Sequence, residues 1–414
     1  LMKHPKPSKT PIAFFAAQYA SLLVGQPGGF ATLEDLCRYA NNECGITGIS
    51  MPTGMLDRTK ILNRPDYADE LKANFEKWGT RLIGLENHTV GQRVCMHPAA
   101  LPRFRKFAPA WAQHLDNSGI EKQAAEEMMT DIDVALKLGI NTLHTFPGGK
   151  SVPVLTQPWS AHPDKLRQKT LAMIALKWED ILAYAGSKGL TIGFELRHIM
   201  EDICSVADLL ELRDKYLLKK DAQEAIRWAA DFSHYLIDDD CPIHDAMIAI
   251  NAEERIAKGE RGVLPIVEEC HAKSGFFDKA VAGHSKPSAN LRWAERAGKF
   301  CTFAVHHPEQ AKLLIRLMQL VHERRPGGAW IKAEGECMFL MNPRQSMKVT
   351  AENIRLIQDG KDPIQLADIV ADKWDGPTFD SFADTGYTAE EAMFLNFEES
   401  TGLQRRLQIV GDLN

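Results

Sequence analysis

Four side chains that can bind a metal ion or transfer a proton directly follow short apolar runs of this chain: Glu195, Asp231, His271 and Glu334. Three carboxylates and one imidazole form a mixed oxygen and nitrogen ligand set that suits Mn²⁺, Mg²⁺ or Co²⁺. A structural zinc site would more often contain thiolates and leave no open position. With four protein ligands, an ion that accepts six can also bind two substrate oxygens. Such an ion polarises a carbonyl and stabilises the enediolate that forms when the adjacent C–H loses its proton.

Each of these residues also has an ordinary structural explanation. Asp231 precedes Phe232, Ser233 and His234 and could cap a helix, and Glu195 lies close to Arg197 and could form a surface ion pair. A lone His271 could be a core histidine. The four residues are separated by 36, 40 and 63 positions, so only a fold that brings distant strand ends together makes them one site. We favour the joint site because four successive apolar runs end in such a residue.

An alternation of short apolar runs and helical segments has to position these residues. The expected strands are residues 12–18, 45–50, 81–86, 141–146, 190–195, 226–231, 264–271 and 328–334. The expected helices between them include 33–40, 67–78, 124–138, 164–187, 206–215 and 309–323. Strands that alternate with helices predict βαβ units and a parallel sheet. Eight such units close a (β/α)₈ TIM barrel, in which the loops after the strands form one rim and bring the four residues together.

An open, doubly wound α/β sheet is the competing architecture. It would be favoured by a glycine-rich phosphate loop after the first strand, but the glycines within 25–29 have the wrong spacing and no Walker-type motif is present. We expect long connections around the seventh strand, at residues 238–262 and 274–299. We assign residues 1–373 to the catalytic barrel and 374–414, which are aromatic and irregular, to a C-terminal extension.

Composition excludes several classes of protein. The chain has 414 residues, 44% of them hydrophobic and 25% charged, and a net charge of −6. There is no basic stripe for nucleic acid, and no apolar run approaches the roughly 18–20 residues of a membrane helix. The eight cysteines are scattered without a CxxC pair, which predicts reduced thiols and a cytoplasmic location. No GxSxG motif is present, which disfavours a serine hydrolase.

The segments around the four residues resemble the xylose isomerase-like TIM barrel superfamily, particularly the sugar phosphate isomerase/epimerase proteins and the D-tagatose 3-epimerase group. Residues 193–198 resemble the strand that ends in a metal-binding, proton-transferring glutamate, and 231–234 resemble an Asp-x-x-His step. Residues 269–273 contain a His-x-Lys step, and 331–334 resemble the last strand with its metal-binding glutamate. The segment 87–92 is similar to the one that follows the third strand. The resemblance covers roughly residues 12–334.

The resemblance implies roles for further residues. It predicts that substrate oxygens are bound by His234, Lys273, Glu201, His88 and His144. The chain also departs from the family pattern. Ser274 stands where an acid is common after His-x-Lys, and Glu336 is a rival to Glu334 as the last ligand. These departures bear on the identity of the substrate more than on the binding of the metal.

The first functional hypothesis is a divalent-metal-dependent sugar isomerase or epimerase with Mn²⁺ as the expected ion and Mg²⁺, Co²⁺ or Zn²⁺ as alternatives. One of Glu195 and Glu334 would remove the proton next to a carbonyl, and the other would return it from the opposite face. The partner would be a small sugar or sugar derivative, and the exposed helices of such barrels can support homo-oligomers.

Three alternatives keep part of this picture. In the first alternative the enzyme is a lyase: the same proton removal is followed by expulsion of a group from the β carbon of a 3-keto-glycoside. The long loops around the seventh strand could accommodate such a substrate. A non-catalytic sugar-binding barrel would not require opposed carboxylates. A nuclease would need more histidines for several zinc ions and a basic groove, and neither is evident in the sequence.

Overall fold

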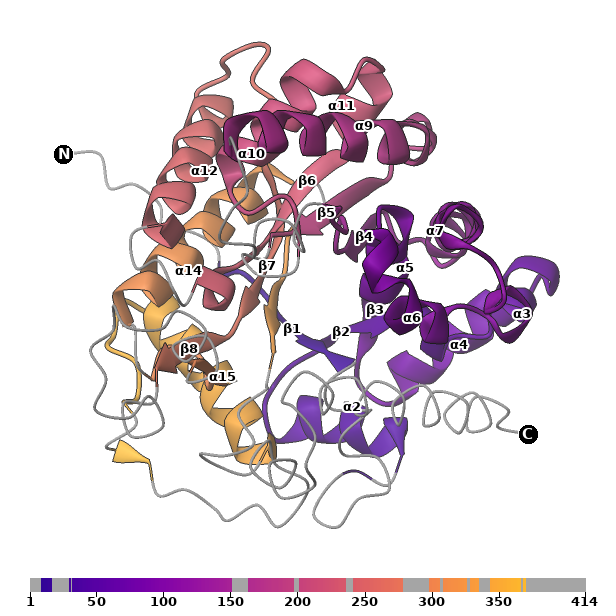
Figure 1. The fold of residues 1–414 in the computed structure, drawn as a ribbon. Helices are drawn as coiled ribbons and strands as arrows, with labels where there is room; N and C mark the ends of the chain where they lie inside the picture. Colours follow the sequence, from indigo (N-terminus) through magenta and orange to yellow (C-terminus); the bar gives the residue numbers. More distant parts are fainter. Residues whose placement is uncertain are drawn as a thin grey trace.

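The computed structural model describes residues 9–16, 30, 32–150, 163–196, 201–235, 241–277, 298–305, 308–325, 328–334, 343–365 and 368–369. Within these ranges, eight parallel strands form a closed barrel (Figure 1): β1 (Ile12–Phe15), β2 (Gly48–Pro52), β3 (Arg81–Glu86), β4 (Thr142–Thr145), β5 (Thr191–Glu195), β6 (Ile226–Asp231), β7 (Val267–Ala272) and β10 (Ile331–Ala333). Neighbouring strands follow the order of the chain, and β1 closes the barrel by pairing with both β2 and β10. The predicted (β/α)₈ barrel is therefore confirmed.

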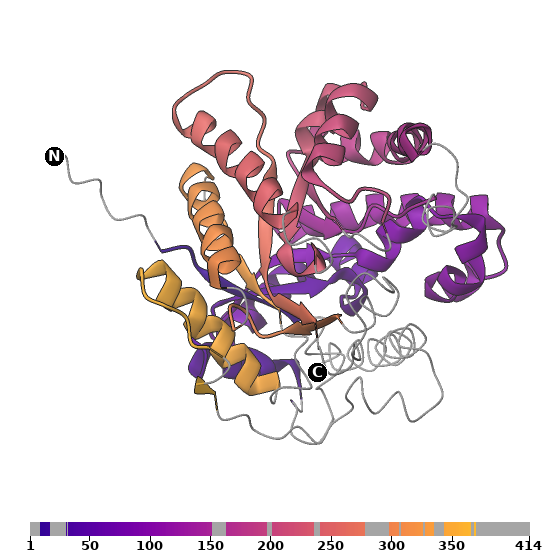
Figure 2. The same cartoon turned by 60° about the vertical axis from the view of Figure 1, so that its left-hand side comes forward.

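Each barrel strand is followed by at least one helix. The helices are α2 (Leu33–Asn42), α3 (Arg58–Asn63), α4 (Tyr67–Lys77), α5 (His88–Val94), α6 (Leu101–Phe104), α7 (Asn117–Lys137), α9 (Pro163–Ser187), α10 (Val206–Glu211), α11 (Lys220–Ala225), α12 (Cys241–Ala257), α14 (Pro308–Arg324) and α15 (Pro343–Gln358). Short turns are η1 (Thr53–Met55), η2 (Pro98–Ala100), η3 (Arg105–Phe107), η4 (Ala110–Ala112), the π-helical η5 (Leu212–Tyr216) and η6 (Phe232–Tyr235). Figure 2 shows α12, α14 and α15 in a row outside the barrel, where α14 packs against both of the others.

The helix α7 illustrates why these segments are helical and how they cover the barrel. Its first turn is capped by Asp116, whose carboxylate accepts a hydrogen bond from the Gly119 amide at 2.8 Å. Buried apolar residues then recur every four positions, at Ile120, Ala124, Met128 and Ile132. This spacing places them on one face of the helix, from which Ala124, Met128 and Ile132 join the main hydrophobic core, while Ile120 packs in a smaller cluster with Met96. No helix in the described ranges is both long enough and apolar enough to cross a membrane.

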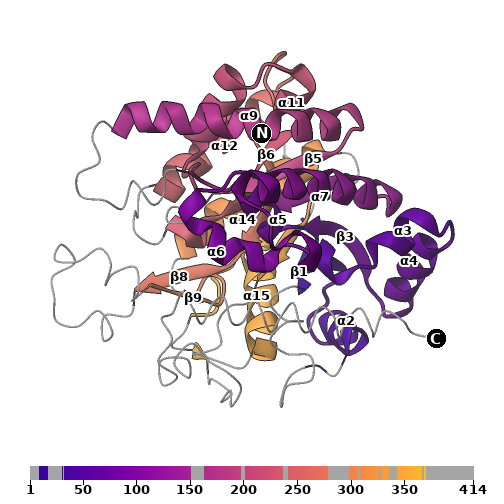
Figure 3. The same ribbon diagram turned by 45° about the vertical axis from the view of Figure 1, so that its right-hand side comes forward.

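The connections around the seventh strand contain secondary structure of their own. Most of residues 238–262 is the regular helix α12, because Ala246, Ala249 and Ile250 recur at helical spacing and are buried. After β7, the chain forms β8 (Ser274–Phe277), which pairs antiparallel with β9 (Gly298–Cys301) outside the barrel (Figure 3). Residues 278–297 and the expected C-terminal extension, 374–414, lie outside the described residues.

Alternation along the strands separates an apolar layer from a charged interior. In β7, Cys270 and Ala272 belong to the hydrophobic core between strands and helices. Glu269, on the other face of the strand, reaches across the barrel to His144 of β4, with 3.1 Å between Oε1 and Nδ1. The interior at the carboxyl ends of the strands is therefore polar, whereas most TIM barrels fill it with branched apolar side chains.

Candidate active site

The four predicted metal ligands come together at the carboxyl ends of β5, β6, β7 and β10. One ligand atom from each of Glu195, Asp231 and His271 lies within 4.8 Å of the others. Glu334 follows β10, and its Oε2 lies 3.2 Å from His271 Nδ1. The corresponding distances from Nδ1 to Glu195 Oε2 and Asp231 Oδ2 are 3.6 and 4.0 Å. All four side chains are buried.

The charges of this group fit a divalent cation. Burial alone would lower the pKa of His271, but the carboxylates around it, Glu334 first, raise that pKa well above its ordinary value. Neither ring nitrogen of His271 has a hydrogen-bond partner among the described residues, although the ring is completely buried. A buried polar atom without a partner is costly. Three carboxylates and one nearby ammonium group leave two net negative charges when the imidazole is neutral, as it must be in a metal ligand.

The ammonium group is that of Lys273, which directly follows β7. Its Nζ lies 3.1 Å from Asp231 Oδ2 and 3.2 Å from Glu334 Oε2. Burial tends to raise the pKa of Glu334, but Lys273 and His271 outweigh burial and hold that pKa well below its usual range. The lowered pKa favours the ionised form of Glu334, which is the form that binds a metal ion.

Asp231 also stabilises the turn that follows it, as its position before residues 232–234 suggested. Its Oδ1 accepts hydrogen bonds from the Ser233 amide at 2.8 Å and from the Ser233 hydroxyl at 2.5 Å, which hold the turn η6. The other oxygen, Oδ2, faces His271 and Lys273. One carboxylate thus serves both the local turn and the site.

His88 reaches the same group from the first turn of α5. Its Nε2 lies 3.1 Å from Glu195 Oε2, and its ring packs on Phe146 with 4.4 Å between ring centroids. Its side chain keeps 15% of its surface exposed, in contrast to the completely buried His271. His88 is therefore within reach of both Glu195 and solvent.

The position of α5 is set by its close contact with β4. The Asn87 amide donates to the His144 carbonyl at 2.8 Å, and the Thr145 hydroxyl donates to the Asn87 carbonyl at 2.7 Å. Gly91 makes this approach possible, since a Cβ there would lie 2.0 Å from Thr145 Oγ1 and 2.2 Å from the Phe146 carbonyl oxygen.

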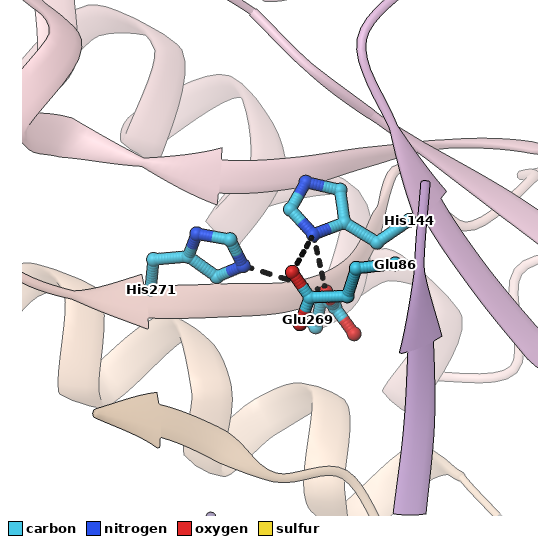
Figure 4. Close-up of side chains that lie close together, drawn as sticks. All are labelled: Glu86, His144, Glu269 and His271. Carbon is cyan, nitrogen blue, oxygen red and sulfur yellow. Dashed lines mark ion pairs between the residues drawn. The ribbon is translucent and has the colours of Figure 1, made fainter. Parts of the chain in front are cut away.

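His144 lies deeper than a substrate-binding residue at the rim. Its Nε2 is 2.8 Å from Glu195 Oε2, and its Nδ1 is 3.1 Å from Glu269 Oε1 and 3.4 Å from Glu86 Oε2. Figure 4 shows Glu86, Glu269, His144 and His271 turned toward one another inside the barrel. Burial and the neighbouring His271 tend to lower the pKa of His144, but the three carboxylates raise it to about 10.

Three interior residues were not found by sequence reasoning: Glu86, Glu269 and Lys332. The Nζ of Lys332 lies 3.0 Å from Glu86 Oε1 and 2.7 Å from Glu269 Oε1. The available signal was a charged residue within a barrel strand, but β3 also contains Arg81 and β7 also contains Glu268, so charge alone did not single out the inward residues. Alternation allows such a residue to point inward or outward, and only the pairing across the barrel decides between them.

The remaining predicted residues fall into two groups. Glu201 is buried among backbone segments, where it accepts hydrogen bonds from Gln92 Nε2 at 2.7 Å and from the Gly148 amide at 2.5 Å. It ties the segments that follow β3, β4 and β5 to one another. The side chain of His234 and the rival ligand Glu336 lie outside the described residues.

Comparisons with known proteins agree with the barrel. A family model described as xylose isomerase-like TIM barrel matches residues 39–260. Similar solved structures include a xylose isomerase domain protein from Planctomyces limnophilus (13% identity, 85% of this chain and 97% of that chain covered, TM-score 0.46). A 3-keto-D-glucoside 4-epimerase from E. coli (14%, 84% and 99%, TM-score 0.45) is also similar. So is a xylose isomerase-like TIM barrel protein from Mycobacterium smegmatis in complex with magnesium (14%, 86% and 98%, TM-score 0.45). The search of curated proteins finds no match.

Proposed function

Because the chain belongs to the xylose isomerase-like TIM barrel family, we propose that it is a divalent-metal-dependent enzyme that isomerises or epimerises a sugar. The observation that carries this proposal is the meeting of Glu195, Asp231 and His271, with Glu334 beside His271, at the carboxyl end of the barrel. Active sites of TIM barrels lie at this end. A group of three buried carboxylates with one lysine is costly without a cation, which is a physical reason to expect one.

The proposed ligands are Glu195, Asp231, His271 and Glu334, and Mn²⁺ is the ion that we would test first. A bound divalent ion supplies a Lewis acid that polarises a substrate carbonyl and stabilises the negative charge that develops when a neighbouring proton leaves. The choice of ion rests on the donor set, which contains hard carboxylate oxygens and one imidazole.

The proton transfers are assigned to the two glutamates. Glu195 follows β5 and Glu334 follows β10, and these strands are separated in the barrel by β6 and β7. Carboxylates that approach from different sides can remove a proton from one face of a carbon and return it to the other. Lys273, whose ammonium group contacts Asp231 and Glu334, is assigned to bind a substrate oxygen between them.

The proposal assigns the outer contacts of the substrate to His88, Lys273 and His234. His88 contacts Glu195 and is partly exposed to solvent, and a residue that binds an incoming sugar needs both properties. Glu201 and His144 are assigned to the protein framework instead, because their polar atoms already face protein groups.

The test is a metal-dependent exchange experiment in D₂O. Protein is stripped of metal, supplied with Mn²⁺ and incubated with ketoses and 3-keto-glycosides, and the products are examined by NMR. We expect deuterium on the carbon next to the carbonyl, dependent on Mn²⁺ and lost in Glu195→Gln. Glu253→Gln is a matched control, since Glu253 is a buried, ion-paired glutamate between α12 and α14 outside the barrel.

The products distinguish the alternatives. An epimer or an aldose–ketose pair supports the isomerase, and a released aglycone indicates a lyase acting through the same proton removal. Tight Mn²⁺ binding without exchange in any substrate would refute the proposed chemistry and favour a sugar-binding barrel. For location, we propose the cytoplasm, because Cys37, Cys44, Cys95 and Cys270 are not disulfide-bonded.

A further inference from the structure

A second group of charged side chains lies inside the barrel, one layer below the proposed site. It consists of Glu86, Glu269, Lys332 and His144, all of them buried. Glu269 precedes His271 by two residues in β7, and Lys332 precedes Glu334 by two residues at β10. Buried charges are tolerated only when they are paired closely. Here Lys332 Nζ meets one carboxylate oxygen of each glutamate, at 3.0 and 2.7 Å.

His144 connects this inner group to the proposed site. Its Nδ1 faces Glu269 and Glu86, and its Nε2 faces Glu195. The ring of His144 therefore lies between the carboxylates of the inner group and the carboxylate of Glu195. The two carboxylates and the ammonium of the inner group leave one net negative charge, against two for the carboxylates and Lys273 of the proposed site.

We propose that His144 is a positioning residue whose ring holds Oε2 of Glu195 in place from inside the barrel. Glu86 and Glu269 fix its orientation, and Lys332 fixes those two carboxylates. A polar group that contacts a ligating carboxylate from behind orients it toward the ion. The inference deepens the proposed function, because it requires that Glu195 binds a divalent ion.

The main alternative is that the inner group is itself a metal site. Glu86, His144, Glu269 and His271 each offer a ligand atom, and these atoms lie within 4.8 Å of one another. However, the ammonium of Lys332 already contacts both carboxylates. The proposed site has three carboxylates beside Lys273, whereas the inner group has only two beside Lys332, so a divalent ion is attracted less strongly to the inner group. Lys332 therefore takes the place of a second cation, and we expect one divalent ion per chain.

The first experiment measures Mn²⁺ binding by calorimetric titration of the full chain. We expect one site in the wild-type protein and an affinity about 10- to 100-fold weaker in His144→Phe, as is typical when a group that orients a ligand is removed. Glu253→Gln controls for the loss of a buried ion pair, and its Mn²⁺ affinity should equal that of the wild type. Wild-type affinity in His144→Phe would overturn the inference.

A second variant keeps the test decisive if His144→Phe does not fold, since that change leaves two buried carboxylates facing Lys332 alone. His144→Phe combined with Glu269→Gln also removes one of the two carboxylates that face the ring and retains the Glu86–Lys332 pair. With Co²⁺ as the probe, we expect the visible absorption bands of this double variant to shift, because Glu195 is no longer held. Unchanged bands and unchanged affinity would mean that His144 only fills space.

The stoichiometry separates the remaining outcomes. Two ions in the wild type, with one lost in Glu86→Gln, would show that the inner group binds metal and would overturn the role of Lys332. A wild-type protein that binds no divalent ion would refute the proposed function itself. A wild-type protein that binds one ion, with the same affinity in both His144 variants, would refute only the positioning role.

Discussion

Asp131 of α7 is a buried carboxylate whose ionisation should make the protein less stable as the pH rises. Its oxygens accept hydrogen bonds from the Thr53 hydroxyl at 3.0 Å, from Arg58 Nη1 at 3.1 Å and from the side-chain amide of Asn87. Burial raises the pKa of Asp131 from 3.8 to about 6, and Arg58 only partly opposes this effect. The folded state therefore binds more protons than the unfolded state between these two values.

The sign and size of the effect follow from this difference. The contribution of Asp131 to stability is complete below the unfolded pKa of 3.8 and is lost as the pH rises through about 6. At about 1.4 kcal/mol for each tenfold change in proton affinity, the full loss is about 3 kcal/mol. About 2 kcal/mol of it falls between about pH 4.5 and 7.

The assay is urea unfolding of the wild type and of Asp131→Asn at several pH values in this range. Other acids titrate in both proteins, so the difference between the two free energies of unfolding isolates Asp131. We expect the asparagine variant to be less stable at pH 4.5, because its amide group cannot accept from all three donors. The gap should narrow by about 2 kcal/mol toward pH 7. A gap that is constant across the range would refute the argument.

Three further predictions follow from the same structure. Gly91→Ala should lower the free energy of unfolding by about 1–3 kcal/mol or more, because its Cβ would overlap the Phe146 carbonyl oxygen. Gly139 has a positive φ, but a Cβ there would meet open space, so Gly139→Ala should lower the free energy of unfolding by only about 1–2 kcal/mol. Equal losses of stability in the two variants would contradict this reasoning. Adding Mn²⁺ to the metal-free protein at about 100 times the dissociation constant should raise the free energy of unfolding by about 2.7 kcal/mol, which is measured as a rise in Tm. An unchanged Tm would argue against a metal site in the folded protein. Lys273→Met should strengthen Mn²⁺ binding, because it removes a positive charge 3.1 Å from Asp231 Oδ2, and a weaker titration would count against Lys273 as a competing cation.

The strands and the four rim residues were predictable because they share a simple pattern. Each of Glu195, Asp231 and Glu334 ends or follows a short, buried and mainly apolar segment, as expected for strands that are buried on both faces. A closed barrel can then be predicted directly, because eight such segments alternate with helices. The four residues were predicted to meet, and the structure brings them together.

The inner group could not be predicted in the same way. Lys332 sits between Ile331 and Ala333, where alternation is compatible with a solvent-facing lysine as well as an inward one. Its partners Glu86 and Glu269 lie 246 and 63 residues away. Such pairings depend on the stagger of the strands around the barrel, and local sequence does not encode the stagger. The helix α12 was missed for a different reason, because its buried face is built from small residues such as Ala246 and Ala249.

The closing contact between β1 and β10 has a consequence for how the protein matures. Glu334 joins Glu195 and Asp231 only when β10 takes its place between β1 and β7, near the end of the described chain. Until then the carboxylates are solvated on separate segments, and closure brings like charges together with Lys273 as the nearby compensation. The proposed ion, if bound by these carboxylates, would offset their repulsion and so stabilise the closed barrel. A newly made chain without metal should then keep the seam between β1 and β10 open for longer and be cleaved there more readily by proteases.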